Sequence, residues 1–148
     1  MTRKRHGGPK RGEAKQRVKT ARGRSNSSTR WLQRQLNDPY VQEAKRVGYR
    51  SRAAFKLIDI DDKFRLMQRN MRIVDLGAAP GGWCQVAVER VGSKGQIVAV
   101  DLLEIDQLGG VEALVGNFYE LETQEAVREC LGDYAALVLS DMGAAATG

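Results

Sequence analysis

Histidine and cysteine are nearly absent from this sequence, which contains one histidine, His6, and two cysteines, Cys84 and Cys130. The cysteines form neither a CxxC pair nor a Cys/His spacing, which argues against a structural zinc site. A single histidine far from any other candidate nucleophile argues equally against a histidine-based triad. Unpatterned cysteines are typical of a reducing cytoplasm, where they serve as small core residues, and we expect no metal.

Long apolar stretches are also lacking. No run approaches the roughly 18 consecutive apolar residues that a membrane helix requires, and no short apolar segment follows the basic N-terminus, as a secretory signal would need. A chain of 148 residues, 42% of them hydrophobic, can form one domain with a real core but hardly two. We therefore expect a cytoplasmic protein without a membrane partner, and a monomer.

Acidic residues are scarce in the first third of the chain. Residues 1–56 contain 17 Lys and Arg and 3 Asp and Glu, a net charge of +14, whereas residues 57–148 contain 7 and 15, a net charge of −8. Residues 1–28 have almost nothing to bury and are expected to be disordered when free. Because Lys and Arg neutralise phosphates, the pattern favours a nucleic-acid-binding tail. A solubilising tail and a mitochondrial transit peptide are the alternatives.

A basic helical segment is predicted over residues 29–70. Ser27 or Ser28 is a suitable N-cap for its first helix, which contains Trp31. Trp31 either stacks on a base or packs in the core.

Two further helices follow in the same segment. Asp38 and Pro39 are typical of a helix start, and Gly48 of a helix end. Ser51 then caps a third helix over residues 52–64.

From residue 72 onward, short apolar strands alternate with helices. The expected strands are residues 72–76, 96–100, 111–115 and 134–140, and the expected helices are residues 83–91 and 121–131. This alternation predicts an α/β fold of right-handed βαβ units with a parallel, Rossmann-like sheet. Because the chain stops soon after the fourth strand, we expect residues 71–148 to form an incomplete core, the first half of a doubly wound, mostly parallel sheet.

Acidic residues and glycines follow the ends of the predicted strands. In an open parallel sheet, ligands bind beyond the carboxyl ends of the strands, so these residues should converge on one edge. They are Asp75, Gly77, Gly81, Gly82, Asp101, Asn117 and Asp141.

The loop after the first strand, DLGAAPGGW, lacks the GxGxxG pattern of dinucleotide-binding proteins. No Lys or Arg lies between residues 73 and 89, and a cation-free loop flanked by acids suits a positively charged ligand better than two phosphates. S-adenosylmethionine fits, because it carries a sulfonium, an ammonium group and a ribose diol that an acid such as Asp101 could bind. The alternatives are glycines that only permit a tight turn, an Asp101 that only caps one, and an NAD-dependent oxidoreductase.

DLGAAPGGW, together with SSTRWLQ and YRSRAAFKL upstream and VDLLEID, GNF and LSDM downstream, resembles the FtsJ/RrmJ-type ribosomal RNA large-subunit 2′-O-methyltransferase family. The resemblance covers residues 26 to about 142. It implies a Rossmann-like S-adenosylmethionine-dependent methyltransferase fold and methylation of a uridine ribose in 23S rRNA of the large ribosomal subunit. It also implies that the methyl donor contacts Gly81, Trp83, Asp101, Asn117 and Asp141.

The same resemblance implies a catalytic Lys–Asp–Lys–Glu tetrad. Lys56 in SRAAFKL matches its first lysine and Asp141 in LSDM matches its aspartate. The second lysine, the proton acceptor of the family, and the glutamate are expected beyond residue 148, so we expect weak or no catalysis from this chain alone. A non-catalytic RNA-binding protein remains the alternative. This sequence differs from the usual pattern of the family at two places: at Asn117, where the family commonly has aspartate, and in the segment after Asp141.

The basic residues before the sheet are expected to bind RNA phosphates, while the 2′-hydroxyl distinguishes RNA from DNA. Arg52 and Lys56 lie four residues apart and are expected on one side of a helix. The expected RNA-binding residues are Arg30, Arg34, Arg50, Arg52 and Lys56.

Overall fold

The computed structural model describes Gly23 and residues 25–142. The chain forms two compact units, Met1–Arg52 and Ala53–Gly148, and each is described by itself. The expectations for most of the basic tail and for the segment after Met142 lie outside the described residues. Within the described part, no helix is long and apolar enough to cross a membrane.

The first unit contains the helices α1 (Asn26–Asn37) and α2 (Pro39–Val47), which contact each other. The start predicted for α1 was wrong by about two residues. Ser25 rather than Ser27 or Ser28 precedes the helix, and its hydroxyl oxygen accepts a hydrogen bond from the backbone N–H of Ser28 at 3.2 Å. Several serines in a row offer equivalent caps, so the sequence alone could not choose among them.

The predicted ends of α2 are confirmed. The carboxylate of Asp38 accepts the backbone N–H of Tyr40 at 2.8 Å, and Pro39 is the first helical residue. Gly48 ends the helix with a φ of 91°, a left-handed conformation that glycine adopts without steric cost. Arg52 forms an ion pair with Asp38, so the acid that caps the helix also holds the end of this unit.

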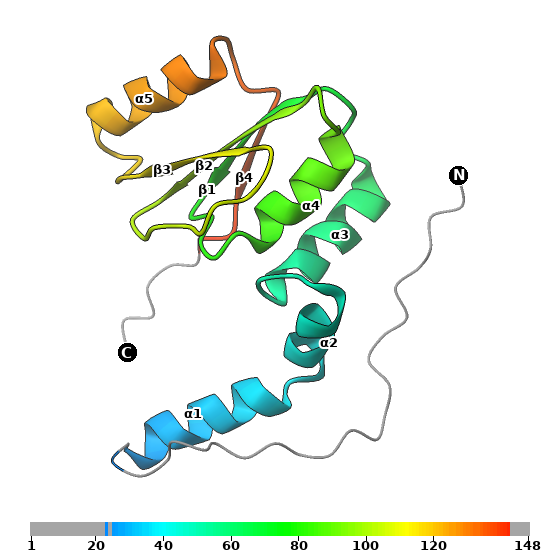
Figure 1. Cartoon of the computed structure of the whole chain (residues 1–148), viewed down its shortest axis with the longest axis vertical. Helices are drawn as coiled ribbons and strands as arrows, with labels where there is room; N and C mark the ends of the chain where they lie inside the picture. The colour runs from blue at the N-terminus through cyan, green and yellow to red at the C-terminus, as the bar shows by residue number, and fades with distance from the viewer. Residues whose placement is uncertain (1–22, 24, 143–148) are drawn as a thin grey trace. The chain divides into compact units, whose positions relative to one another are not determined.

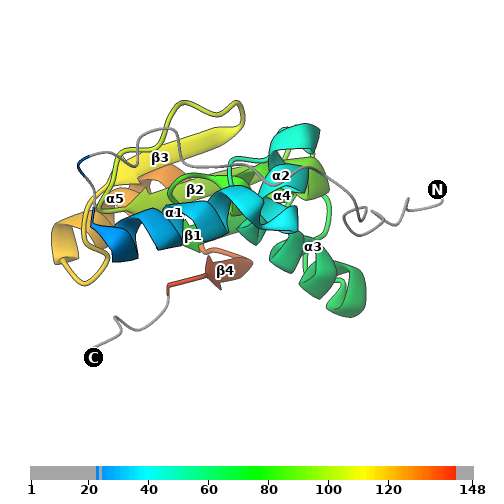
Figure 2. The same cartoon turned by 90° about the horizontal axis from the view of Figure 1, so that it is seen from below.

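The second unit contains a four-stranded parallel sheet. Its strands are β1 (Arg72–Leu76), β2 (Gln96–Asp101), β3 (Val111–Val115) and β4 (Leu137–Ser140), in the spatial order β3-β2-β1-β4. Figure 2 shows this order from below. The predicted parallel sheet is confirmed, but β4 begins at Leu137 instead of at residue 134. Tyr134 is exposed and its N–H binds the Asp133 side chain instead of a neighbouring strand.

Three helices accompany the sheet: α3 (Ala53–Phe64), α4 (Gly82–Val91) and α5 (Leu121–Leu131). The crossovers β1–α4–β2 and β3–α5–β4 run in opposite directions across the sheet, so their common right-handedness places α4 and α5 on opposite faces (Figure 1). The core on the α5 face consists of Val74, Leu76, Val98, Val100, Val127 and Leu131. Each of these side chains contributes roughly 1.5–3 kcal/mol when fully buried.

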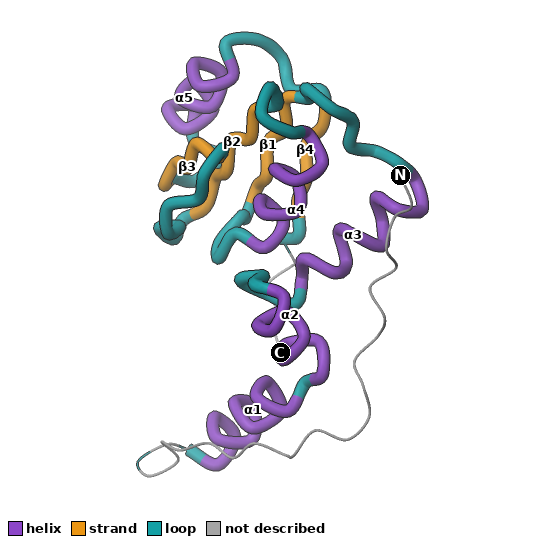
Figure 3. The backbone as a smooth tube through the Cα atoms, turned by 45° about the vertical axis from the view of Figure 1, so that its right-hand side comes forward, coloured by secondary structure: helices purple, strands orange, loops and turns teal. Residues whose placement is uncertain are grey.

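Helix α3 packs against α4 (Figure 3). It begins at Ala53 and is therefore one residue shorter than the predicted helix over residues 52–64. The fully buried carboxylate of Asp61 on α3 accepts the backbone N–H of Met67 at 2.8 Å and lies 3.2 Å from the guanidinium of Arg90 on α4. Arg90 also pairs with Asp62. These contacts fix α3, which carries Lys56, against the sheet-covering helix.

The strand order creates a topological switch point between β1 and β4. The chain moves outward from β1 to β2 and β3, and then returns to the other side of β1. Open α/β sheets bind ligands beyond the carboxyl ends of the strands at such a switch point. Asp75 in β1 and Asp141 just after β4 stand at this point.

Candidate active site

The glycine loop leaves β1 and enters α4 at the ligand edge of the sheet. The backbone N–H groups of Gly77 and Ala78 both donate to the carbonyl of Val100, which ties the loop to the end of β2. Gly77 has a φ of 70°, and a Cβ at this position would collide with the Met142 side chain. Gly81, with a φ of 113°, makes the final turn into α4. Both glycines thus adopt backbone conformations that other residues rarely adopt, and a side chain at position 77 would in addition have to displace Met142.

Asp101 connects the loops that follow β1 and β2. One of its carboxylate oxygens accepts the N–H of Ala79 and the other accepts the N–H of Leu103, both at 2.9 Å. The turn-capping role considered for this residue is therefore present. Each carboxylate oxygen has a second lone pair, so these bonds leave Asp101 able to accept from a ligand hydroxyl.

Asp75 is the buried acid of this edge, with 1% of its surface exposed. The pKa of Asp75 is raised from 3.8 to about 6, mainly because the carboxyl is buried and also because the negative charges of Asp141 and Asp101 lie close to it. A hydrogen bond from the Cys84 thiol, at 3.2 Å, acts in the opposite direction. The electrostatic coupling of Asp75 to both other acids shows that the three predicted carboxylates do converge.

Lys56 joins this edge from α3. Its side-chain nitrogen lies 2.6 Å from a carboxylate oxygen of Asp141 and 5.9 Å from the centre of the Trp83 ring. Trp83 is buried, and its indole N–H donates to the backbone carbonyl of Ala53 at 2.7 Å. Trp83 thus anchors the start of α3 and lies under the Lys56 ammonium group.

Asn117 follows β3 at the same edge of the sheet. The N–H of Gly116 donates to the carbonyl of Asp101, which holds this turn beside the end of β2. The side-chain oxygen of Asn117 accepts the N–H of Tyr119 at 3.0 Å. Asn117 therefore stabilises a turn, and its amide N–H₂ group can donate to a ligand.

The donor set at this edge fits a positively charged ligand that also carries hydroxyls. Three carboxylates surround a loop in which no residue from 73 to 89 is Lys or Arg. A pyrophosphate would meet net negative charge here, whereas a sulfonium or ammonium group would be attracted.

The sequence model of the FtsJ-like methyltransferase family matches residues 49–148, about two thirds of the chain and all of the edge described above. The chain belongs to the FtsJ-like methyltransferase family.

Curated relatives agree with this FtsJ-like assignment. Proteins of Parvibaculum lavamentivorans and Xanthobacter autotrophicus, both described as ribosomal RNA large subunit methyltransferase E, are 56% and 57% identical to this chain over 144 residues. The alignments cover 90% and 95% of this chain, and 57% of each relative. The chain therefore spans somewhat more than half of the length of these relatives.

A solved FtsJ-type structure has a similar fold. It is a ribosomal RNA methyltransferase of Plasmodium falciparum, 33% identical, with a TM-score of 0.63. The superposition covers 68% of this chain and 59% of the other. It supports the predicted Rossmann-like architecture of the FtsJ-like region.

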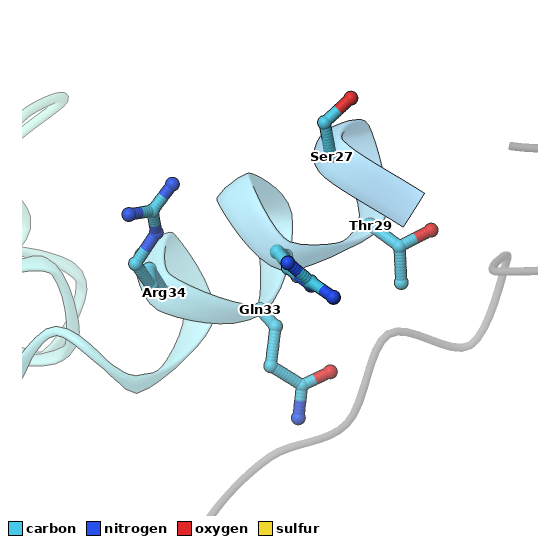
Figure 4. A pocket seen from close by; sticks show the side chains of 5 residues that line it. Ser27, Thr29, Gln33 and Arg34 are labelled. Carbon is cyan, nitrogen blue, oxygen red and sulfur yellow. The ribbon is translucent and has the colours of Figure 1, made fainter. Parts of the chain in front are cut away.

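The expected RNA-binding arginines lie in the first unit, around two hollows. The first, of about 620 Å³, lies along α1 (Figure 4), and the described residues that line it are Ser27, Thr29, Arg30, Gln33 and Arg34. The second, of about 200 Å³, is lined by Val41, Ala44, Lys45, Tyr49, Arg50, Ser51 and Arg52. Hydroxyl and amide groups beside arginines are suited to phosphate oxygens. The Trp31 side chain is 55% exposed, which argues against a core role.

Two expectations about the FtsJ-like region needed revision. Arg52 precedes α3 instead of lying in it, so the helical spacing argument for Arg52 and Lys56 does not apply. Sequence reasoning also treated Cys84 as a mere core residue and missed its hydrogen bond to Asp75. No spacing rule joins a strand residue to a helix residue nine positions later, so only the packing of α4 on β1 could reveal this contact.

Proposed function

We propose that this chain takes part in S-adenosylmethionine-dependent 2′-O-methylation of a uridine ribose in 23S rRNA of the large ribosomal subunit. The observation that carries the proposal is the placement of Lys56 against Asp141, beside the further carboxylates Asp75 and Asp101. The names of the relatives support ribosomal RNA as the substrate.

The methyl donor would be held by residues at the carboxyl ends of the strands. When bound, S-adenosylmethionine supplies an electrophilic methyl group on a positively charged sulfur. Asp101 would accept hydrogen bonds from its ribose hydroxyls, and the side-chain N–H₂ group of Asn117 would donate to the adenine. Asp75 and Asp141 supply the negative potential that attracts the sulfonium and ammonium charges. Gly77 and Gly81 let the loop backbone approach the ligand.

The RNA hydroxyl would be positioned by the pair formed by Lys56 and Asp141. Asp141 would hold the Lys56 ammonium group, which would donate a hydrogen bond to the 2′-oxygen and align it with the methyl group. The proton of the hydroxyl would pass to the second lysine that the family resemblance implies. Positioning of two reactants in line is a large part of the acceleration available to such a transfer. A 2′-hydroxyl is absent from DNA, so this contact also selects RNA.

Donor binding is the first test, measured by calorimetry on the 148-residue chain. We expect S-adenosylmethionine to bind, its neutral product S-adenosylhomocysteine to bind more weakly, and NAD not to bind. Asp101→Asn should weaken donor binding about tenfold or more, the usual effect of losing hydrogen bonds to a charged group. Asp133→Asn is the matched control, because Asp133 pairs with Arg72 at the opposite edge of the sheet. NAD binding as tight as donor binding would refute the proposal.

Methyl transfer is the second test. Because the second lysine and the glutamate are expected beyond residue 148, the chain is first extended with the remaining part of one of the relatives. Tritiated donor is then incubated with the extended chain and unmethylated large subunits, and the 23S rRNA is hydrolysed with alkali. A methyl group on the 2′-oxygen protects the adjacent phosphodiester, so label should appear in alkali-stable dinucleotides that contain uridine. Label only in mononucleotides would mean methylation of a base, and would contradict the proposed chemistry.

RNA binding by the first unit is the third test. Arg30→Ala combined with Arg34→Ala should weaken binding to 23S rRNA fragments. The slope of log affinity against log salt should also fall by about one unit for each phosphate that the variant no longer neutralises. Lys94→Ala combined with Arg128→Ala removes the same charge from the second unit and is the control. Equal weakening in both double variants would show a general charge effect instead of a defined binding surface.

A further inference from the structure

Cys84 lies directly behind the acidic edge of the sheet. It is the third residue of α4, and its sulfur is 3.2 Å from a carboxylate oxygen of Asp75. Cys84 is 0% exposed and Asp75 is 1% exposed, so the contact is shielded from water on both sides. A hydrogen bond in such an environment is electrostatically stronger than the same bond in water.

The surroundings of Asp75 otherwise oppose its negative charge. Burial disfavours the ionised carboxylate, and like charges face it from Asp101 at the end of β2 and from Asp141 after β4. Lys56 from α3 brings a positive charge to this edge, and its ammonium group is engaged with Asp141. From α4, the group that faces Asp75 is the Cys84 thiol, whose S–H donation favours the anion.

We propose that Cys84 is a positioning residue for the methyl-donor site, whose thiol holds Asp75 in place as an anion through its S–H···O hydrogen bond. This inference rests on the proposed function, because it assigns the negative charge of Asp75 to attraction of a cationic ligand. The thiol acts through Asp75 and does not itself contact the ligand.

A neutral donor suits this task for a physical reason. A lysine or arginine at position 84 would stabilise the Asp75 anion, but its positive charge would cancel the attraction that a sulfonium feels at the same edge. An S–H group stabilises the anion by a hydrogen bond alone and leaves the net charge of the site unchanged. The structure thus combines a buried anion with a negative potential at the ligand edge.

The first experiment titrates Asp75 without any ligand. Carbon-13 carboxyl NMR on the 148-residue chain gives the titration midpoint of Asp75, assigned with Asp75→Asn. We expect Cys84→Ala to raise this midpoint by about one pH unit, the equivalent of one weak hydrogen bond to a charge. Cys84→Ser keeps a donor and should restore the midpoint. Cys130→Ala, on the opposite face of the sheet, is the matched control and should not move it.

The second experiment measures donor affinity between pH 5 and pH 9 by calorimetry. At pH 9, Cys84→Ala should bind S-adenosylmethionine as tightly as the unaltered chain does. As the pH is lowered, the variant should lose affinity at a higher pH than the unaltered chain. A merely structural role would instead weaken binding equally at every pH. Equal weakening, or an unchanged midpoint in the NMR titration, would overturn the inference.

The two proposals can fail separately. If the unaltered chain binds no donor at any pH, the proposed function fails, and the ligand-free midpoint still decides the role of Cys84. If Cys84→Ala does not fold, the S–H stretching band of Cys84, recorded in the Cys130→Ala chain, decides instead. It should rise in frequency as Asp75 is protonated through pH 6, and a band that is constant over this range would overturn the inference.

Discussion

The side-chain nitrogen of Lys56 lies 2.6 Å from a carboxylate oxygen of Asp141, although 85 positions separate the two residues in the sequence. Lys56 extends from α3 and Asp141 follows β4, so the pair forms only when the helix and the sheet are assembled. The Lys56 side chain is 61% exposed, and ion pairs this exposed contribute at most about 1 kcal/mol to stability. The geometry is therefore better explained by the site than by folding.

Substitution of Lys56 should separate methyl transfer from donor binding. In the extended chain, Lys56→Met should reduce methyl transfer to 23S rRNA to background, because no ammonium group aligns the 2′-hydroxyl. Donor affinity should be equal or slightly higher, since removal of a positive charge makes the edge more negative. Radiolabel transfer and calorimetry measure the two effects. Lys63→Met, which also removes a lysine of α3 beside an aromatic ring, is the control and should change neither.

Asp75 should lower stability at neutral pH. Its pKa is about 6 in the folded chain against an ordinary value of 3.8, so the folded state binds the proton more tightly and gains stability as pH falls from 7 to 4. Above pH 7 the buried anion costs roughly 3 kcal/mol, at about 1.4 kcal/mol for each pKa unit. Asp75→Asn should remove this cost at pH 8, and its advantage should vanish near pH 4.

Urea unfolding at pH 8, 6 and 4 measures this difference in the free energy of unfolding. The same variant should bind the methyl donor more weakly, so gain of stability and loss of binding should occur together. Asp133→Asn, at the opposite edge of the sheet, should show neither effect. An Asp75→Asn chain no more stable than the unaltered chain at pH 8 would refute the assignment.

The contact between Asp61 and Arg90 should be the main polar link between α3 and α4. Asp61 is fully buried, and its two oxygens face the Met67 N–H and the Arg90 guanidinium. Asp61→Asn leaves a partly buried arginine without this partner and should lower the free energy of unfolding by about 2–4 kcal/mol. Asp62→Asn removes the exposed partner of the same arginine and should cost less than about 1 kcal/mol. Chemical denaturation compares them, and equal losses would contradict the prediction.

Gly77 should tolerate no side chain. Gly77 and Gly132 have similar positive φ angles, 70° and 67°, but a Cβ would collide with Met142 at the first and would meet nothing within 4 Å at the second. Gly132→Ala should cost about 1 kcal/mol of backbone strain, and Gly77→Ala about 2–4 kcal/mol. Addition of Met142→Ala should recover the excess at Gly77, which a double-mutant cycle measures. Equal costs at both glycines would exclude the steric explanation.

Local sequence patterns predicted the first and last residues of several helices and strands correctly. β1, β3 and α5 have the bounds expected from their apolar patterns and flanking turn residues. The Asp38–Pro39 start of α2 and its Gly48 end were predicted for the same reason, because caps act on backbone groups within the same turn. The convergence of acids on one sheet edge followed from parallel topology alone.

The predictions from the sequence were wrong or incomplete where several residues could cap the same helix, and where a contact with a residue distant in the sequence determined the structure. Ser25 was chosen over the next serines as the cap of α1, and Tyr134 was left outside β4 although it continued the apolar pattern. The partner of Arg52 is Asp38, a residue 14 positions away. The Cys84–Asp75 hydrogen bond belongs to the same class, because it depends on how α4 packs on β1.

The sequence by itself determines the order of strands and helices, the glycine loop and the family resemblance. It can do so because helix and strand propensity, hydrophobic periodicity and turn chemistry act over a few neighbouring residues. Which side chains meet is a different matter. Lys56 with Asp141, Asp61 with Arg90 and Cys84 with Asp75 became partners only when the elements packed, since burial and direction in space set such contacts and neither is a property of a short stretch of chain.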